Sequence, residues 1–511
     1  MKIVINYWRW PILAISILLI HVKCYSQFPK YDNIWLMPDY TRNIMVMRFN
    51  KRVDSLNVKL DSVKKYLYFG KTGAIISDKD GILKAYSNGC FINHAGYNIM
   101  ENGDDINSGV NRHETCDADF YAAGEQGALF IPNPIDSLQY YMIHASTVIQ
   151  YSPLKAWVDA LRYSLIDMRY NNGLGKAIEK NKIIINDSTT LADIGAVKHS
   201  NNHDWWIIVK KYFVGSYDKF LLTDNGINFI NNQQIGDTSN RYEDGGGVVH
   251  IFSPNDGSKM VRYHPYDDGF YLYDFDRNSG LLSNFKRILV ADSSVLDGGA
   301  CFSPSGRFLY IGTYWDLYQY DLKAIDIKSS EVHIAHYDGY RSLGIFRTMI
   351  GKMQWGPDCK IYVNCRNSMD ALHVIHKPDE KGIACDFRQH DLKLPQTHSG
   401  TIPNFPNYRL GVAPVCDPEL TVTIQEVPVL PEILVYPNPA RDNITLSFRE
   451  SLLHKANLRI MNTSGQVMES TNLPSGSYEY SMNTTCWVSG IYFYTISLWD
   501  GYLATGKFVI E

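Results

Sequence analysis

Three stretches of the sequence share one pattern, and this pattern decides the fold: Ile251–Gly257 (IFSPNDG), Cys301–Gly306 (CFSPSG) and Gln354–Cys359 (QWGPDC). In each stretch an aromatic residue is followed by Ser or Gly, then Pro, then a residue type that favours turns. The proline returns after 50 and then 53 residues. An earlier copy, Ile76–Gly81 (ISDKDG), lacks the proline. The pattern therefore indicates a structural unit that recurs about every 50 residues.

Further apolar segments follow these turns at similar distances. A second segment follows two of the turns (Phe308–Ile311, Lys360–Val363), and a third stands further on in three units (Gly269–Asp276, Leu317–Asp321, Ala371–Ile375). Short alternating strands with a turn signal about every 8–12 residues, repeated at 40–50 residues, predict the blades of a β-propeller. A single blade cannot bury both of its faces, so blades must stack around an axis.

The predicted fold class is all-β: a propeller of about seven blades over residues 31–412, followed by a small C-terminal β-sandwich. Weaker units fit at 128–170 and 194–235, and six or eight blades remain open. We expect the segment after Gly400 to close the ring with Asn33–Met37. The 35 tyrosines suit half-buried strands, which agrees with this fold class.

The predicted propeller resembles the propeller regions of exported Bacteroidetes proteins, which are related to WD40-like and YVTN-type repeats. The resemblance covers most of residues 31–410. It implies no catalytic residues, because the matching stretches are structural: Asn33–Met37, Tyr163–Met168, Asn172–Lys176, Lys198–His199 with His203–Trp206, the Phe-Ser-Pro turns and Ile402–Phe405.

Residues 1–26 have the form of a secretory signal peptide. Lys2 and Arg9 precede the apolar run Pro11–Val22, and we expect cleavage between Ser26 and Gln27. A lipid anchor on Cys24 is the alternative, but His-Val-Lys before it does not suit a lipobox. No later apolar run approaches 18 residues, so no transmembrane segment is predicted. Removing residues 1–26 takes away three cations and no acid, which changes the formal net charge from −4 to −7.

Eight cysteines remain after this cleavage, an even number that permits disulfides in an exported chain. Cys90 and Cys116 flank a polar loop, and Cys359 and Cys365 flank a strand-like segment. These two pairs are candidate disulfides, and the pairing stays open; the spacings do not resemble a zinc site.

The amino-acid composition and the strand pattern change in the last hundred residues. Residues 413–434 are rich in Pro and Val and predict an extended linker, and residues 435–511 contain several short strands with Gly turns. This end of the chain resembles the type A C-terminal sorting domain of the type IX secretion system. The elements that carry the resemblance occur in the family's order: Tyr436, Pro437, Asn438 and Pro439 (YPNP), Gly465, Gly490 with Tyr492 (SGIY), and Lys507.

The resemblance implies Sec export to the periplasm and passage through the type IX machinery, which would be the partner of this domain. In that family the domain is usually removed, and the protein is released or attached to surface lipopolysaccharide. An adhesive β-sandwich is the alternative interpretation.

Motifs of catalysis are absent from the sequence: there is no G-x-S-x-G, P-loop, H-E-x-x-H or C-x-x-C. We therefore predict no catalytic, cofactor or metal residues. His333 and His336 should point to opposite faces of a strand, whereas His199 and His203 flank a turn and could approach one ion. Calcium at Asp78–Gly81 or Asn255–Gly257 is an open alternative, although these turns offer two or three oxygens where six to eight are needed.

Three hypotheses about function follow. The first is an exported binding or scaffold propeller for an unknown glycan or protein. The second is a metal-assisted, lactonase-like propeller hydrolase, and the third is a structural surface protein linked to gliding or adhesion. The pI of about 6.4 excludes a nucleic-acid binder held by a basic field.

Overall fold

The structure is a computed structural model of the whole chain. It describes residues 29–38, 44–50, 69–108, 116, 126–151, 154–189, 194–212, 214–236, 249–265, 269–291, 297–365, 367–398, 400–411, 416–418, 420–426, 433–448, 455–498 and 501–511. The expected signal peptide and its cleavage site at Ser26 and Gln27 lie outside these residues.

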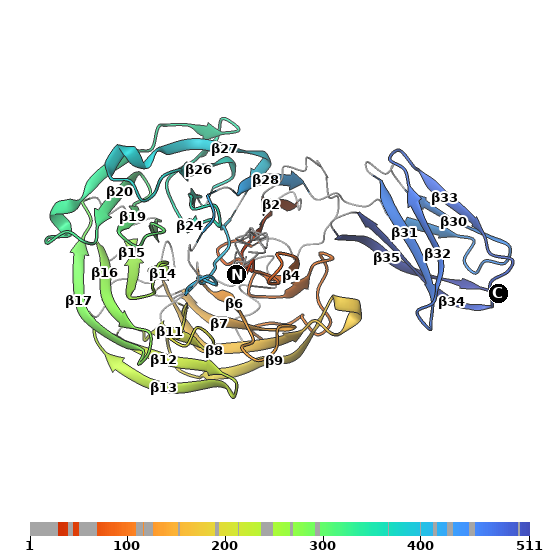
Figure 1. Ribbon diagram of the computed structural model, residues 1–511, viewed down its shortest axis with the longest axis horizontal. Coiled ribbons are helices and arrows are strands. Elements are labelled where there is room, and N and C mark those ends of the chain that lie inside the picture. The colour runs from red at the N-terminus through yellow and green to blue at the C-terminus, as the bar shows by residue number, and fades with distance from the viewer. Residues whose placement is uncertain are drawn as a thin grey trace, which may run out of the picture.

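Seven antiparallel sheets surround one axis and form the predicted propeller (Figure 1). Five of them have four strands each. These are β6 (Ala128–Pro132), β7 (Gln139–Tyr151), β8 (Leu154–Asp167) and β9 (Lys176–Ile185); β10 (Gly195–Lys198), β11 (Trp205–Lys210), β12 (Ser216–Thr223) and β13 (Gly226–Gln234); β14 (Val249–Phe252), β15 (Lys259–His264), β16 (Gly269–Asp276) and β17 (Leu281–Leu289); β18 (Gly299–Phe302), β19 (Phe308–Gly312), β20 (Asp316–Asp321) and β21 (Val332–His336); and β24 (Met353–Trp355), β25 (Ile361–Val363), β26 (Met369–Ile375) and β27 (Phe387–His398).

The other two sheets show three strands each within the described residues. One is β3 (Ala74–Ser77), β4 (Leu83–Ser87) and β5 (Ile92–His94). The other joins β1 (Ile34–Pro38) and β2 (Ile44–Asn50) to β28 (Thr421–Glu426), a strand from the far end of the propeller sequence. The expected number of blades is confirmed, and the units predicted at 128–170 and 194–235 are blades.

The recurring turns satisfy their own polar groups. Ser253 donates its hydroxyl to Asp256 Oδ1 at 2.9 Å and accepts the backbone N–H of Lys259 at 3.1 Å. Ser303 accepts the N–H of Phe308 at 3.2 Å in the equivalent turn. These bonds join the two strands on either side of each turn, so they explain why the Ser-Pro pattern recurs.

Tyrosine side chains supply much of the packing between blades. Most of the largest fully buried side chains are tyrosines. Tyr217 and Tyr273 lie edge to face on neighbouring blades, with ring centroids 5.5 Å apart and hydroxyls in contact at 3.1 Å. Such rings bury a large apolar area while the hydroxyl keeps a partner, which accounts for the tyrosine excess.

Ring closure differs in part from the expectation. β28 pairs with β2, from Met45 opposite Glu426 to Asn50 opposite Thr421. The prediction that all of 413–434 is a linker is therefore wrong: residues 421–426 form a strand of the first blade. Their alternating Thr, Val and Ile residues suit a strand, whereas their Pro- and Val-rich surroundings suggested a linker.

Two disulfides tie the described chain, and only one of them was predicted correctly. Cys90 bonds Cys116 as expected. Cys359 bonds Cys416 and not Cys365, with Cα atoms 5.2 Å apart, and Cys365 is a buried free thiol. Cys359 ends the proline turn before β25, and Cys416 shortly precedes β28, so the bond fixes the closing strand to the last blade.

The C-terminal residues form the expected sandwich (Figure 1). One sheet contains β29 (Ile433–Tyr436), β30 (Asn443–Phe448) and β33 (Glu479–Asn483). The other runs in the order β32 (Val467–Leu473), β31 (Ala456–Asn462), β34 (Gly490–Leu498) and β35 (Gly501–Ile510). Alternate side chains of both sheets, such as Leu446, Ile460 and Phe508, are fully buried between them.

Peptide mapping can test the disulfide that closes the ring. A non-reducing digest should yield a peptide pair linked through Cys359 and Cys416, while Cys365 reacts with a thiol reagent only after unfolding. C416S should lower the free energy of unfolding by about 2–4 kcal/mol, and the matched control C365S should change it much less. A peptide linked through Cys359 and Cys365 would contradict the structure.

Truncation can test the closing strand. A chain that stops after Leu430 keeps β28 and should unfold at the same temperature as the propeller of the full chain. A chain that stops after Glu419 retains Cys416 but exposes the edge of β2, and should lose at least about 2 kcal/mol of stability. Equal stability of the two truncated proteins would refute the role of β28.

Candidate functional site

The centre of the propeller is where a channel ligand would bind, and a segment of the chain itself occupies it. Residues 400–411 run beside β1 without forming a strand: Ile402 packs in one buried cluster with Trp35 of β1, and the ring centroids of Trp35 and Phe405 are 6.1 Å apart. Asn404 donates its N–H to Gly73 O at 2.8 Å, and its side-chain amide lies 3.3 Å from Ala128 O. The segment therefore lies where an innermost strand of the first blade would be, and it also touches other blades.

Further contacts carry the segment across the ring. The hydroxyl of Tyr408 donates to Phe130 O at 2.8 Å, and the side-chain amide of Asn407 donates to Pro254 O at 2.7 Å. Phe130 belongs to β6 and Pro254 follows β14, so the segment bonds to two blades besides the one that contains β1.

The side-chain amide of Gln126 joins this segment to β14. Gln126 Nε2 lies 3.2 Å from both Asn404 Oδ1 and His250 O, and Gln126 Oε1 accepts the N–H of His250 at 2.6 Å. Residue 195 beside His250 is a glycine, and a Cβ atom at this position would lie only 2.8 Å from the His250 ring. A larger residue would therefore displace His250. The cavity that remains is only about 50 Å³. It has room for a few water molecules, whereas small-molecule sites usually measure about 300–1,000 Å³.

The lining of this cavity offers little acid–base or metal chemistry. None of the described lining residues is an Asp or Glu; those with reactive side chains are His250, Cys301 and Lys352. Burial raises the pKa of the Cys301 thiol to about 12, so it is not a thiolate at neutral pH. His250 Nε2 faces the sulfur of Met260 at 2.8 Å. The described residues thus provide neither a carboxylate pair nor a metal-ligand set here.

A buried ion pair holds the end of the segment. Arg409 donates to Asp32 Oδ1 at 2.5 Å and to Asn33 Oδ1 at 3.0 Å, and both charged side chains are nearly inaccessible. Burial raises the pKa of Asp32 even though Arg409 opposes this shift. The pair joins residues from the two ends of the propeller sequence.

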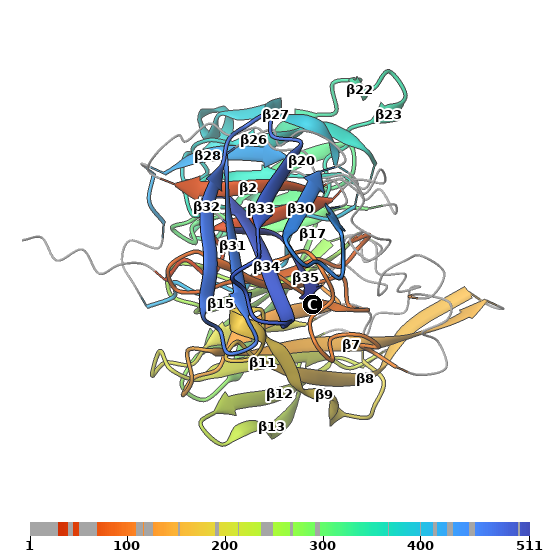
Figure 2. The same ribbon diagram turned by 90° about the vertical axis from the view of Figure 1, so that its right-hand side faces the viewer.

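A hairpin between β21 and β24 exposes several apolar side chains close together. Its strands are β22 (Arg341–Ser342) and β23 (Phe346–Arg347), and Leu343 and Ile345 at its tip are 66% and 67% exposed. Figure 2 shows this hairpin and the β7–β8 hairpin extending on the same side of the propeller. We call this side the leading face, because the loops that lead into the innermost strands lie there.

Aromatic rings support the base of the hairpin. The ring of Trp315 contacts those of Tyr314 at 4.8 Å and Tyr337 at 5.6 Å, and the Arg347 guanidinium lies 5.6 Å from its centroid. Tyr340 donates its hydroxyl to Asp370 at 2.7 Å. The hairpin therefore presents aliphatic, aromatic and cationic groups from a supported base.

Histidines below this hairpin are structural. Burial and the neighbouring His390 lower the pKa of His373 to about 3, so His373 is neutral. Its Nε2–H donates to Thr348 O at 3.0 Å and its Nδ1 accepts the N–H of His390 at 3.0 Å. Both ring nitrogens are thus used, and none is left for a metal.

The predicted orientation of His333 and His336 is wrong. Nε2 of His333 and Nδ1 of His336 lie 2.7 and 2.9 Å from the same oxygen, Asp316 Oδ1. A bulge shifts the register between β20 and β21 at Leu317 and Tyr318, which brings both imidazoles to one carboxylate.

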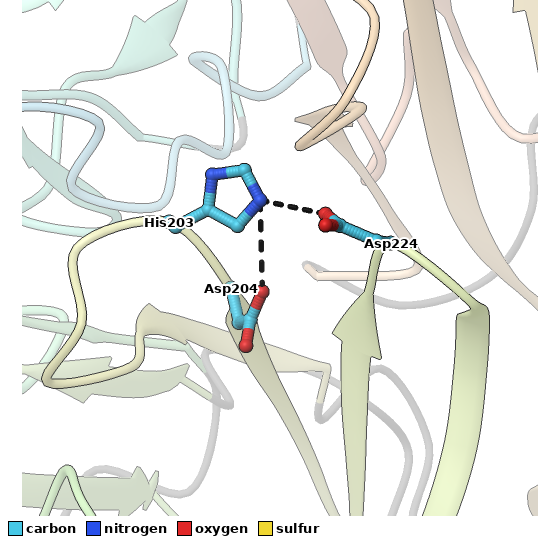
Figure 3. Close-up of side chains that lie close together, drawn as sticks. All are labelled: His203, Asp204 and Asp224. Carbon is cyan, nitrogen blue, oxygen red and sulfur yellow. Dashed lines mark hydrogen bonds and ion pairs between the residues drawn. The ribbon is translucent and has the colours of Figure 1, made fainter.

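Within the described part of the chain, one group of three side chains lies close enough together to hold a metal ion: His203, Asp204 and Asp224 (Figure 3). His203 Nε2 lies 2.6 Å from Asp224 Oδ1 and 4.0 Å from Asp204 Oδ1. The sequence suggested His203 but paired it with His199, whose Nε2 instead faces Asn278 O at 3.0 Å. An exposed His–Asp pair explains this geometry without an ion.

The turns considered for calcium use their carboxylates locally. Asp78 Oδ1 accepts the N–H groups of Asp80 and Ile82, and Asp78 Oδ2 pairs with Lys84 at 3.0 Å. Asp256 Oδ1 accepts from Ser253 and Ser258. Nothing in these contacts points to a bound cation.

The motif residues of the C-terminal domain fix its last strand. Asn438 Oδ1 accepts the N–H of Val509 at 2.9 Å, between Pro437 and Pro439, and Ala440 bridges to Ile510. Tyr492 is buried and stacks on Phe508, with centroids 5.8 Å apart. The remaining motif residues lie at the surface or at strand ends: Tyr436 at the end of β29, Gly465 in the β31–β32 turn, Gly490 opposite Ile510, and Lys507 opposite Phe493.

Residues 434–511 match the family described as the secretion system C-terminal sorting domain. This match confirms the predicted resemblance and identifies a protein of the Bacteroidetes that the type IX secretion system exports to the cell surface. No curated protein matches the chain in sequence. Among the described residues, none forms a helix long and apolar enough to cross a bilayer.

Solved structures resemble the propeller only distantly. A putative 6-phosphogluconolactonase from Bacteroides fragilis is 11% identical, with a TM-score of 0.40, and the match covers 73% of this chain and 99% of that one. A periplasmic gluconolactonase from Pseudomonas aeruginosa is 13% identical, with a TM-score of 0.34 and coverage of 71% and 88%. We draw no functional argument from either.

A double-mutant cycle can test the ion pair that holds the central segment. R409M leaves Asp32 buried without its partner and should cost about 3–5 kcal/mol of stability. Because burial raises the folded-state pKa of Asp32, this variant should be least stable above the normal carboxyl pKa and recover as the pH falls. D32N/R409M, measured by urea unfolding, should regain most of the loss; an additive loss would contradict a direct pairing.

Proposed function

Because residues 434–511 are a sorting domain of the type IX secretion system, the chain acts at or beyond the cell surface, and we propose that its propeller serves there as a binding module. The observation that carries this proposal is the filled centre: residues 400–411 leave a cavity of about 50 Å³. A ligand must then bind on an exposed face of the propeller and not in the channel.

The leading face offers the best surface for a partner. The β22–β23 hairpin exposes Leu343, Ile345 and Phe346 beside Arg341 and Arg347. Aromatic and arginine side chains are enriched among the residues that contribute most at protein interfaces, and the exposed aliphatic side chains beside them add apolar area for a partner to cover. This composition favours a protein partner, while the aromatic base with Trp315 and Tyr340 gives a glycan as the second candidate.

The hydrolase alternative has weaker support. A metal-assisted hydrolase needs several carboxylate or imidazole ligands around an open site, and no described residue lining the central cavity is a carboxylate. None of His203, Asp204 and Asp224 lines the central cavity, and His203 and Asp224 are exposed. A structural role in gliding or adhesion is compatible with a binding face and would be one use of it.

Substitution of the hairpin tip tests the proposed binding face. The variant L343S/I345S in the chain from residue 27 onward should bind surface proteins of the producing bacterium at least tenfold more weakly, because it removes the exposed apolar contacts. The matched control I135S/L138S removes similarly exposed residues from the turn between β6 and β7. Immobilised outer-membrane protein and surface polysaccharide fractions serve as separate probes.

Three results of this assay are informative. The proposal is supported if L343S/I345S, but not the control, loses binding to the protein fraction. If L343S/I345S loses binding to the polysaccharide fraction alone, the partner is a glycan. Unchanged binding by L343S/I345S, or an equal loss in the control, would eliminate the hairpin as the binding surface.

A further inference from the structure

The outer face of one sorting-domain sheet is unusually apolar. In the sheet β32-β31-β34-β35, alternate residues such as Leu458, Ile460 and Ile496 point into the sandwich and are fully buried. The residues between them face outward, where an antiparallel sheet normally carries polar side chains. At one end of this sheet the outward residues are apolar instead.

These apolar residues form a continuous stripe across all four strands. Strand pairing places Val467 opposite Met461, Met461 opposite Phe493, and Ile491 opposite Val509. Ile491 and Phe493 are two residues apart, so they share the outward face. Phe493 and Ile491 are 43% and 44% exposed. We call Met461, Val467, Ile491, Phe493 and Val509 the apolar stripe.

Charge on this face has one sign. Lys507 is paired opposite Phe493 and Arg459 lies two residues from Met461, both on the outward side and both exposed. They line an open hollow whose far wall is formed by Asn171, Asn172 and Leu174 of the propeller. The other outward residues described on these strands are uncharged: Asn457, Ser470, Asn472, Thr495, Ser497 and Thr505. No carboxylate neutralises the two cations from within the described part of this face.

We propose that the apolar stripe with Lys507 and Arg459 is the surface through which the sorting domain docks on a protein of the type IX machinery. The partner surface has an apolar centre with carboxylates beside it. Apolar side chains exclude water at the centre of such a contact, while the two cations select an acidic rim and speed the encounter. Gly465 and Lys507, two of the residues that carry the family resemblance, border this stripe.

The residues of the proposed docking surface differ in role from the remaining motif residues. Asn438 binds the last strand and Tyr492 is buried in the core, so we expect their loss to destabilise the domain. The apolar stripe is not needed for the core, because its side chains lie outside it. Substitutions there should separate recognition from folding.

Fractionation of cells that express the full chain tests the proposal. I491T/F493T places β-branched threonine, which suits strands, at both positions, and should lower secretion at least tenfold while folded protein accumulates in the periplasm. K507E/R459E should have the same effect, and K507Q/R459Q a smaller one. The control N472T/S497T changes the same face away from the stripe and from Arg459, since both residues pair with Asn457, and should be secreted normally.

A truncated chain that lacks residues 431–511 shows whether the docking proposal or the export assignment has failed. This truncated protein should stay in the periplasm. If it is secreted, the domain does not direct export, and the docking proposal is contradicted as well. Normal secretion of I491T/F493T or K507E/R459E, alongside periplasmic retention of the truncated chain, would overturn the docking surface alone. Thermal unfolding of each purified variant checks that the sandwich remains folded.

Sedimentation separates docking on the machinery from self-association. Wild-type protein should be monomeric at micromolar concentration. A dimer that I491T/F493T abolishes, together with normal secretion of that variant, would assign the stripe to contacts between copies and overturn the proposal.

Discussion

The buried ion pair between Arg409 and Asp32 joins the two ends of the propeller sequence, and the closed ring depends on the segment that this pair holds. A propeller is stable only when its last blade packs on its first, since each blade buries its faces on its neighbours. Here closure uses three connections in sequence: residues 400–411 inside the ring, the Cys359–Cys416 bond, and β28 on the outside of the first blade. Each connects chain that follows the last complete blade to a blade of the ring.

This mode of closure has a direct consequence for function. The innermost position that a strand of the first blade would fill is taken by an irregular segment with amide side chains, Asn404 and Asn407, that bond to other blades. Irregular backbone in a dry interior needs partners for its polar groups, and the bonds across the ring supply them. The channel is consequently part of the fold, which leaves the exposed faces for recognition.

Much of the architecture follows from local sequence. The Ser-Pro turns could be recognised because their bonds are made within a few residues, as between Ser253 and Asp256. The sorting domain could be recognised because its motif residues tie its two ends together. The partner of Cys359 could not be predicted, because Cys416 reaches it only when the ring closes, 57 residues further on. The two histidines on Asp316 depend on a β-bulge that strand periodicity does not reveal.

The candidate binding face was equally beyond sequence reasoning. Leu343 and Ile345 look like ordinary strand residues in the sequence, and only the structure shows that they project from the propeller. Likewise, Ile491 and Phe493 belong to an alternating apolar strand, and sequence alone does not tell which of its two faces is covered. An exposed apolar side chain becomes a candidate for recognition only after the core has been located.

Hydrogen exchange of residues 400–411 in the full chain tests most directly the claim that the propeller's centre is filled. The N–H of Asn404 is bonded to Gly73 O inside the ring, so peptides covering this segment should exchange as slowly as those covering β6 and β14. Exchange of these peptides within seconds, while β6 and β14 remain protected, would show that the segment lies outside the channel and would contradict the account.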